Sequence, residues 1–127
     1  MGRMDGVIIA IIITDHIKNN KKKIKSGIAF NPSTPKEKII PFLDLADMIL
    51  VMSVEPGYCG QSFHMNAIER VKFFKANYKD KFIEVDGGVS TENSAILAEN
   101  GADILVAGSA IFKSDDPIYT IKQMKKS

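Results

Sequence analysis

The residues best suited to chemistry in this 127-residue sequence directly follow four short apolar runs. They form the segments Asn31-Pro32, Glu55-Pro56-Gly57, Asp86-Gly87-Gly88 and Gly108-Ser109. If the apolar runs are parallel strands, these segments meet at the carboxyl edge of one sheet, where ligands bind in parallel α/β folds. The spacing therefore predicts a single ligand-binding rim.

A Gly-Gly pair and a Gly-Ser pair at this rim predict an anion site. Backbone N–H groups approach an anion closely where no Cβ intervenes, and a Gly-Ser pair before a helix adds a hydroxyl and the positive end of the helix dipole. Gly87, Gly88, Gly108 and Ser109 would then form a phosphate cradle. The alternative is that each pair only turns the chain. Two pairs on consecutive strand ends favour phosphate binding.

Asp86 is the strongest single candidate for acid–base chemistry because it ends an apolar run at this rim. A carboxylate there can bind a metal or move a proton beside a carbonyl, although a helix cap or turn acceptor would also account for it. Glu55 is expected to orient its loop through backbone amides, and Met52 is expected to fill core space. Cys59, the only cysteine, would need a histidine base from elsewhere to act as a nucleophile, and no residue pattern supports one.

The order of apolar and amphipathic stretches predicts the elements that position these residues. From Lys25 onward, short apolar runs alternate with helical patterns, which is typical of parallel strands joined by crossover helices. The predicted strands are Gly27 to Phe30, Asp47 to Val54, Phe82 to Val85 and Asp103 to Ala107, with Val7 to Thr14 as a candidate fifth. None alternates strictly between apolar and polar residues, so we expect both faces to be covered.

Helix signals occupy the intervals between the predicted strands. Thr34, Pro35 and Glu37 form a capping box with proline at the first helical position, and Pro41 ends or kinks that short helix. Further helices are predicted between Met65 and Tyr78, from a Ser90 cap to Gly101, and from Asp116-Pro117 onward. The chain therefore contains about four to five β/α units.

The composition predicts one soluble globular domain spanning residues 1–127. The chain is 45% hydrophobic and 25% charged with a net charge of +2, which is unlike a nucleic-acid-binding footprint. The one basic run, Lys18 to Lys25, is expected to be a solvated helix face or loop, with an RNA or anionic surface as the alternative role. Val7 to Thr14 is too short to cross a membrane, which takes about 20 residues. A lone cysteine favours the cytoplasm.

Four quoted segments carry a resemblance to a known family: "GIAFNPSTP" (27–35), "MILVMSVEPGYCGQSF" (48–63), "IEVDGGV" (83–89) and "GADILVAGSAIF" (101–112). In this order they resemble the second half of ribulose-phosphate 3-epimerase, over about residues 25 to 127. The resemblance implies a partial (β/α)8 TIM barrel of the ribulose-phosphate-binding type. It also implies interconversion of D-ribulose 5-phosphate and D-xylulose 5-phosphate, in the pentose phosphate pathway, by proton removal and return at C3.

The resemblance implies roles for individual rim residues. Asp86 matches an aspartate that binds a divalent metal and serves as one of two acid/base groups on opposite faces of the sugar. Met52 matches a methionine that lines the site. The segments expected to contact the substrate and its phosphate contain Gly57, Tyr58, Cys59, Gly60, Gly87, Gly88, Gly108 and Ser109.

Parts of the family pattern have no counterpart in this sequence. The first strand with its serine and the other acid/base group, and a D-x-H segment with a metal histidine, are missing, so most of the metal ligands are absent. A complete barrel takes about 200 residues or more, and Cys59 stands where a glycine is usual. We therefore expect a truncated epimerase, with Val7 to His16 as a remnant of the fourth strand, that is impaired or inactive alone.

The open half of such a barrel also predicts a partner. Uncovered apolar strands favour pairing with another chain, so we expect a homo-oligomer or self-association. The alternatives to the epimerase are a non-catalytic sugar-phosphate-binding or subunit-interaction fragment, or an allulose-6-phosphate 3-epimerase. No nucleic-acid or membrane partner is expected.

Overall fold

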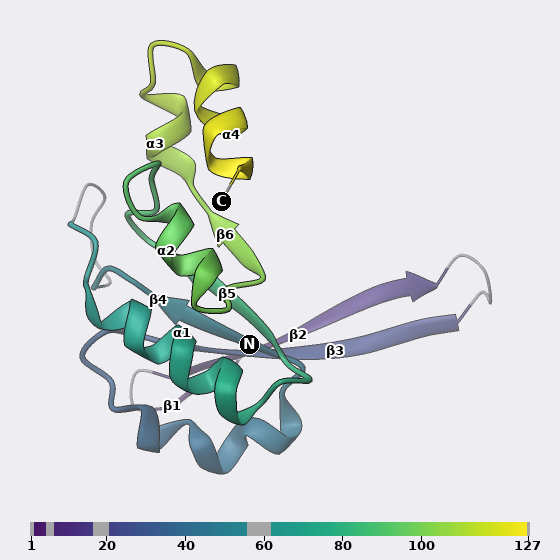
Figure 1. Cartoon of the computed structure of the whole chain (residues 1–127). Coiled ribbons are helices and arrows are strands. Elements are labelled where there is room, and N and C mark those ends of the chain that lie inside the picture. The colour runs from purple at the N-terminus through teal and green to yellow at the C-terminus, as the bar shows by residue number, and fades with distance from the viewer. Residues whose placement is uncertain (1, 5–6, 17–20, 56–61, 127) are drawn as a thin grey trace.

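A six-stranded sheet with strand order β1-β2-β3-β4-β5-β6 forms the framework of the computed structural model (Figure 1). The structure describes residues 2–4, 7–16, 21–55 and 62–126, with side chains from Lys25 onward. The strands are β1 (Gly2–Met4), β2 (Val7–His16), β3 (Lys21–Phe30), β4 (Met48–Met52), β5 (Phe82–Asp86) and β6 (Ile104–Val106). β3 to β6 run parallel, as the sequence predicts, and with their helices they form part of a (β/α)8 barrel.

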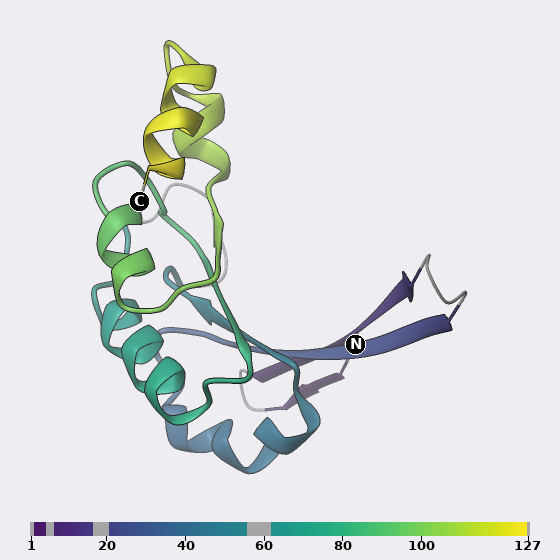
Figure 2. The same cartoon turned by 45° about the vertical axis from the view of Figure 1, so that its right-hand side comes forward.

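Helices lie along the outer side of the curved sheet where they connect its parallel strands, and the last two helices follow the final strand (Figure 2). They are η1 (Lys36–Lys38), η2 (Ile40–Leu45), α1 (Asn66–Asn77), α2 (Ser94–Glu99), α3 (Gly108–Phe112) and α4 (Pro117–Lys125). Helical crossovers are what parallel neighbouring strands require. None of the helices in the described part of the chain is long and apolar enough to cross a membrane.

The core lies between the parallel strands and the helices, because alternate side chains of each strand point toward the helices. On β5, Ile83 and Val85 are fully buried in one cluster with Phe74 of α1. Phe74 also meets Phe30 of β3 edge-on, with ring centroids 5.6 Å apart. Burial of one such side chain contributes about 1.5–3 kcal/mol. This layer therefore holds the parallel strands against α1.

The inner face of the parallel strands is only partly covered by the residues that the structure describes. Phe82, Ile104 and Val106 are 46%, 37% and 38% exposed. Asp86 shares this face with Phe82, because alternate residues of a strand point the same way. The prediction that both faces are covered is therefore wrong for the described residues. The apolar runs that suggested it are typical of barrel strands, whose inner side chains are buried when the barrel is closed.

The amino-terminal strands differ from the prediction in direction. Val7 to Thr14 does lie in a strand, β2, but β2 runs antiparallel to β3, and the pair extends beyond the rest of the sheet (Figure 1). Only residues 17–20 separate the two strands, whereas a parallel crossover needs about a dozen residues. Val7 to His16 is therefore not a parallel fourth strand of the barrel.

The predicted role of the basic run also changes. Lys21 to Lys25 belong to β3 rather than to a helix face or loop. Residues 18–20 of the same run lie outside the described residues.

Helix boundaries follow the prediction where the capping contact is local. α1 and α4 fall within the expected ranges, and Asp116 accepts a hydrogen bond from the Tyr119 N–H at 3.1 Å at the start of α4. The capping box at Thr34 is wrong, because Pro35 precedes η1 and no side chain caps it. Thr34 instead closes a turn, with its N–H donating to the Asn31 carbonyl at 3.0 Å.

The other helix predictions hold in part. Pro41 lies in the first turn of η2, so two short 3-10 helices replace the single helix predicted there. α2 begins at Ser94 rather than after a Ser90 cap, because Ser90 lies in a turn where Asn93 Oδ1 accepts its N–H at 2.9 Å. The end of α2 is close to the prediction, since Gly101 follows with a φ of 115°.

Candidate active site

The carboxyl ends of the parallel strands bring the predicted rim residues together. Asp86 ends β5, and its register places it between Met52 of β4 and Val106 of β6. The Gly87-Gly88 pair follows directly, and the Gly108-Ser109 pair opens α3 after the neighbouring strand. The structure therefore places the Gly-Gly pair and the Gly-Ser pair after adjacent strand ends, one of which carries Asp86.

The surroundings of Asp86 favour its protonated form. The side chain is half-buried, and this burial raises the pKa of Asp86 above its ordinary value. Glu84, two residues earlier on the same face, also has a raised pKa, first because of burial and then because of the negative charge of Asp86. A carboxyl with a raised pKa is better suited to accept and return a proton than one with its ordinary pKa.

Gly87 and Gly88 are required by the close approach of two rim loops. Their φ angles are 122° and 66°, which side chains with a Cβ rarely adopt. A Cβ on Gly87 would lie 2.7 Å from Val54 Cγ2, and one on Gly88 would lie 3.1 Å from the backbone of Phe63. The turn role of this pair therefore has direct support. Binding of phosphate by the pair stays a prediction.

The loop that follows β4 is closed at its base. Ser53 donates its N–H to the Asp86 carbonyl at 2.8 Å and accepts the His64 N–H at 2.7 Å. Its hydroxyl also donates to the Gly87 carbonyl. The segment between Ser53 and His64 is thus closed by the hydrogen bond between these two residues, and its Ser53 end is attached to the end of β5. The predicted contact residues Gly57, Tyr58, Cys59 and Gly60 belong to this segment but lie outside the described residues.

Glu55 links two rim loops through a contact with Ser33, a residue that the sequence pattern did not single out. Ser33, in the loop after β3, donates its hydroxyl to Glu55 Oε2 at 3.1 Å. The loop-orienting role predicted for Glu55 therefore includes a side-chain contact between neighbouring strand ends.

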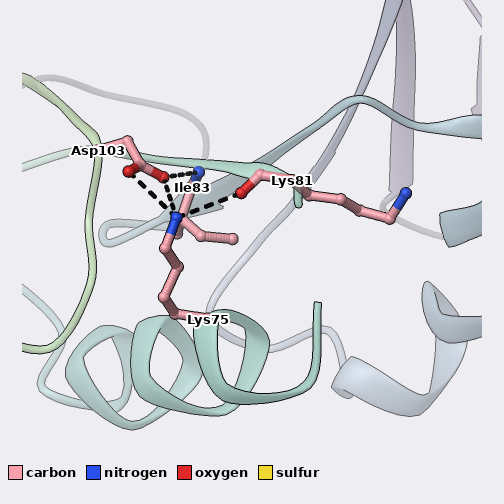
Figure 3. Close-up of polar contacts among 4 residues, drawn as sticks. All are labelled: Lys75, Lys81, Ile83 and Asp103. Carbon is pink, nitrogen blue, oxygen red and sulfur yellow. Dashed lines mark hydrogen bonds and ion pairs between the residues drawn. The ribbon is translucent and has the colours of Figure 1, made fainter. Parts of the chain in front are cut away.

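Two aspartates fix the strand register at the end opposite the rim. Asp103, just before β6, accepts the Ile83 N–H of β5 at 2.9 Å and pairs with the Lys75 ammonium at 2.9 Å (Figure 3). Asp47, just before β4, accepts the Ser26 N–H of β3 at 2.9 Å. In both cases the N–H of the aspartate donates to the carbonyl of the same neighbour at 2.8 Å. This repeated contact aligns the strands that carry the rim residues.

The sequence contains a signal for these contacts that the prediction missed. An Ala-Asp pair precedes both apolar runs, as "ADMILV" at 46–51 and "ADILV" at 102–106. A polar residue at a strand start is ordinarily solvated, so the repeat alone does not identify the neighbouring N–H as its partner.

The residues present near Asp86 do not fit a metal site by themselves. Among the residues that the structure describes, no group of three or more histidine, cysteine, aspartate or glutamate side chains could hold a metal ion. Glu84 is the nearest carboxyl on the same strand face, and His64 is exposed at the base of the loop after β4.

Parallel strands with helices on their outer side and polar residues at their carboxyl ends place the chain in the (β/α)8-barrel class, of which it contains a part. Comparison with known proteins then identifies the family. A family model described as "Ribulose-phosphate 3 epimerase family" matches residues 9–112. The chain belongs to this family of isomerases, which confirms the resemblance inferred from the sequence.

Three curated relatives show the extent of the similarity, and each is described as ribulose-phosphate 3-epimerase. The Schizosaccharomyces pombe protein is 40% identical over 108 residues, which cover 85% of this chain and 47% of the relative. The Chlamydia muridarum protein is 44% identical over 109 residues, which cover 81% of this chain and 47% of the relative. The Bacillus subtilis protein is 38% identical over 109 residues, which cover 82% of this chain and 50% of the relative. The chain spans about half the length of these relatives.

Proposed function

We propose that the chain binds a ketopentose 5-phosphate at the rim and that Asp86 exchanges a proton with C3 of the sugar. This is one half of the interconversion of D-ribulose 5-phosphate and D-xylulose 5-phosphate. The observation that carries the proposal is the half-buried carboxyl of Asp86 at the end of β5, in a chain of the ribulose-phosphate 3-epimerase family. A cytoplasmic location is part of the proposal because of the lone cysteine.

The phosphate is proposed to lie across the glycine-containing strand ends. Gly88, Gly108 and Ser109 are exposed, which leaves these strand ends accessible to an anionic ligand. The proposed contacts further include Gly87, Gly57, Tyr58, Cys59 and Gly60. Met52, beside Asp86 on the inner face, would contact the sugar.

The acid–base step follows from the position of C3 beside the C2 carbonyl. Loss of the C3 proton gives an enediolate, and Asp86, with its raised pKa, can accept that proton and return it. Inversion also needs a group on the opposite face of the sugar. Glu84 does not meet this need, because it comes from the same strand as Asp86. We therefore propose that epimerisation by the chain alone is impaired or absent.

A divalent metal would stabilise the charge of the enediolate if it were bound. Asp86 is the residue proposed to ligate it. Because the described residues do not complete a site, no step of the proposal depends on the metal.

Proton exchange in D2O tests this proposal. Each epimer is incubated with the chain, and 1H NMR follows loss of the C3 proton and formation of the other epimer. We expect deuterium to enter C3 of one epimer only, with loss of this exchange in Asp86→Asn and no loss in the exposed control Asp44→Asn. Equal exchange in the parent and Asp86→Asn would reject the assigned role. Allulose 6-phosphate in the same assay tests the related substrate.

A non-catalytic sugar-phosphate-binding role is the second candidate. It is favoured by the presence of the glycine pairs beside a single strand-end carboxyl. Binding of D-ribulose 5-phosphate without any C3 exchange would support this candidate over the acid–base role.

We also propose that two copies of the chain associate through the inner face. β6 ends the sheet order, so its outer backbone groups have no strand partner among the described residues. Ile104 and Val106 of β6 are more than one-third exposed beside this edge. Sedimentation should give a dimer that Ile104→Lys dissociates, whereas a monomeric parent chain would contradict the proposal.

A further inference from the structure

The loop that follows β3 is bound by an arginine on the outer helix α1. Arg70 Nη1 donates to the Asn31 carbonyl at 2.9 Å, and Nη2 donates to the Thr34 carbonyl at 2.7 Å. The guanidinium also lies over the Phe30 ring, 4.8 Å from its centroid. A planar fork of donors can bridge two carbonyls while stacking on a ring, and a lysine ammonium cannot reproduce this geometry.

A second side chain of α1 supports the same loop. Asn66, one helical turn before Arg70, donates its Nδ2 to the Pro32 carbonyl at 3.0 Å. Pro32 and Thr34 are buried residues, so these carbonyls are poorly placed to bond to water instead. Loss of a donor to such a group costs its desolvation. The loop conformation therefore depends on α1.

The loop is connected to the rim at two points. Asn31 directly follows the last residue of β3. Ser33 donates to Glu55 at 3.1 Å, and Glu55 directly precedes the segment that contains the predicted phosphate contacts. A displacement of the loop would therefore reach two strand ends.

We propose that Arg70 is a positioning residue of the ligand-binding rim. It holds the loop from Asn31 to Thr34 in place and, through the Ser33 hydroxyl, the side chain of Glu55 at the neighbouring strand end. The consequence for ligand binding rests on the proposed function, whereas the consequence for the loop does not. Arg70 acts through the backbone of this loop rather than by contact with the ligand.

Amide hydrogen exchange without ligand tests the first part. In Arg70→Met, exchange of the loop amides within residues 31–34, which are those of Asn31, Ser33 and Thr34, should be about tenfold faster, which corresponds to about 1.4 kcal/mol of local opening. Arg70→Lys should give an intermediate rate, and Lys72→Met, at an exposed position of the same helix, should change nothing. Unchanged exchange at 31–34, or an equal increase at the β5 amides, would overturn the inference.

Affinity for D-ribulose 5-phosphate, measured by calorimetry on folded variants, tests the second part. Arg70→Met should weaken binding about tenfold. Ser33→Ala should also weaken it, but with unchanged amide exchange at residues 31 and 34, because Arg70 and Asn66 still hold the carbonyls of the loop. Faster loop exchange with unchanged affinity would refute the positioning role. If the parent chain does not bind the sugar phosphate, the proposed function fails, and the exchange rates still decide whether Arg70 holds the loop.

Discussion

Replacement of Gly87 by alanine tests the close contact between the loops after β4 and β5. The new Cβ would lie 2.7 Å from Val54 Cγ2 and 2.9 Å from the Val54 backbone nitrogen. The side chain could rotate away, but the backbone nitrogen could not. A φ of 122° adds strain for any residue with a Cβ. Strained backbone costs about 1–3 kcal/mol, and overpacking costs a similar amount. The free energy of unfolding should fall by about 2–5 kcal/mol.

Gly108→Ala provides the matched control at the neighbouring strand end. No atom lies within 4 Å of the Cβ that alanine would add there, and the position begins α3. Alanine is also the better helix former, so Gly108→Ala should leave stability unchanged or slightly raised. Thermal unfolding should give a midpoint about 10 °C lower for Gly87→Ala than for Gly108→Ala. Equal midpoints would refute the packing described at the rim.

Four further substitutions test separate features of the structure. Asp103→Ala should lower the free energy of unfolding by about 1–3 kcal/mol, because a β5 N–H loses its acceptor. Lys75→Met should lower the same free energy by at most about 1 kcal/mol, because the ion pair is nearly one-third exposed. Equal losses of stability for Asp103→Ala and Lys75→Met in denaturant titrations would contradict this. Because the pKa of Asp86 is raised in the folded chain, its protonated carboxyl stabilises the fold. This contribution is fully present below about pH 3.8, the ordinary pKa, and is lost as the pH rises through the folded-state pKa. Asp86→Asn should therefore lose less stability than the parent as pH rises from 3.8 toward neutrality, and identical pH dependence would reject the shift. Asp116→Ala should cost about 1 kcal/mol through loss of the α4 cap, with the adjacent Asp115→Ala as a control that changes little.

Sequence reasoning succeeded where the determining contacts are local. β4, β5 and α1 could be predicted because each combines an apolar pattern with clear ends. The Asp116 cap of α4 involves residues three apart, so it is visible in the sequence. Asp86 could be placed at the rim because it directly follows a strand pattern.

Sequence reasoning failed where a distant partner decides the outcome. Thr34 has the pattern of a helix cap, but Arg70, far along the chain, binds its carbonyl and favours a turn. The direction of β2 was mistaken because its apolar run suits either orientation, although the short connection to β3 allows only the antiparallel one. Arg70 and Asp103 were overlooked because charged residues on helices and at strand starts usually face solvent.

The central claim, that the rim binds a ketopentose 5-phosphate, is tested most directly by backbone amide NMR. D-ribulose 5-phosphate is titrated into the 15N-labelled chain, with unphosphorylated D-ribulose as the control. We predict saturable shifts at Gly87, Gly88, Gly108 and Ser109 with the phosphorylated sugar and much smaller shifts with the control. Absence of shifts, or shifts confined to residues away from the carboxyl ends of β4 to β6, would contradict the claim.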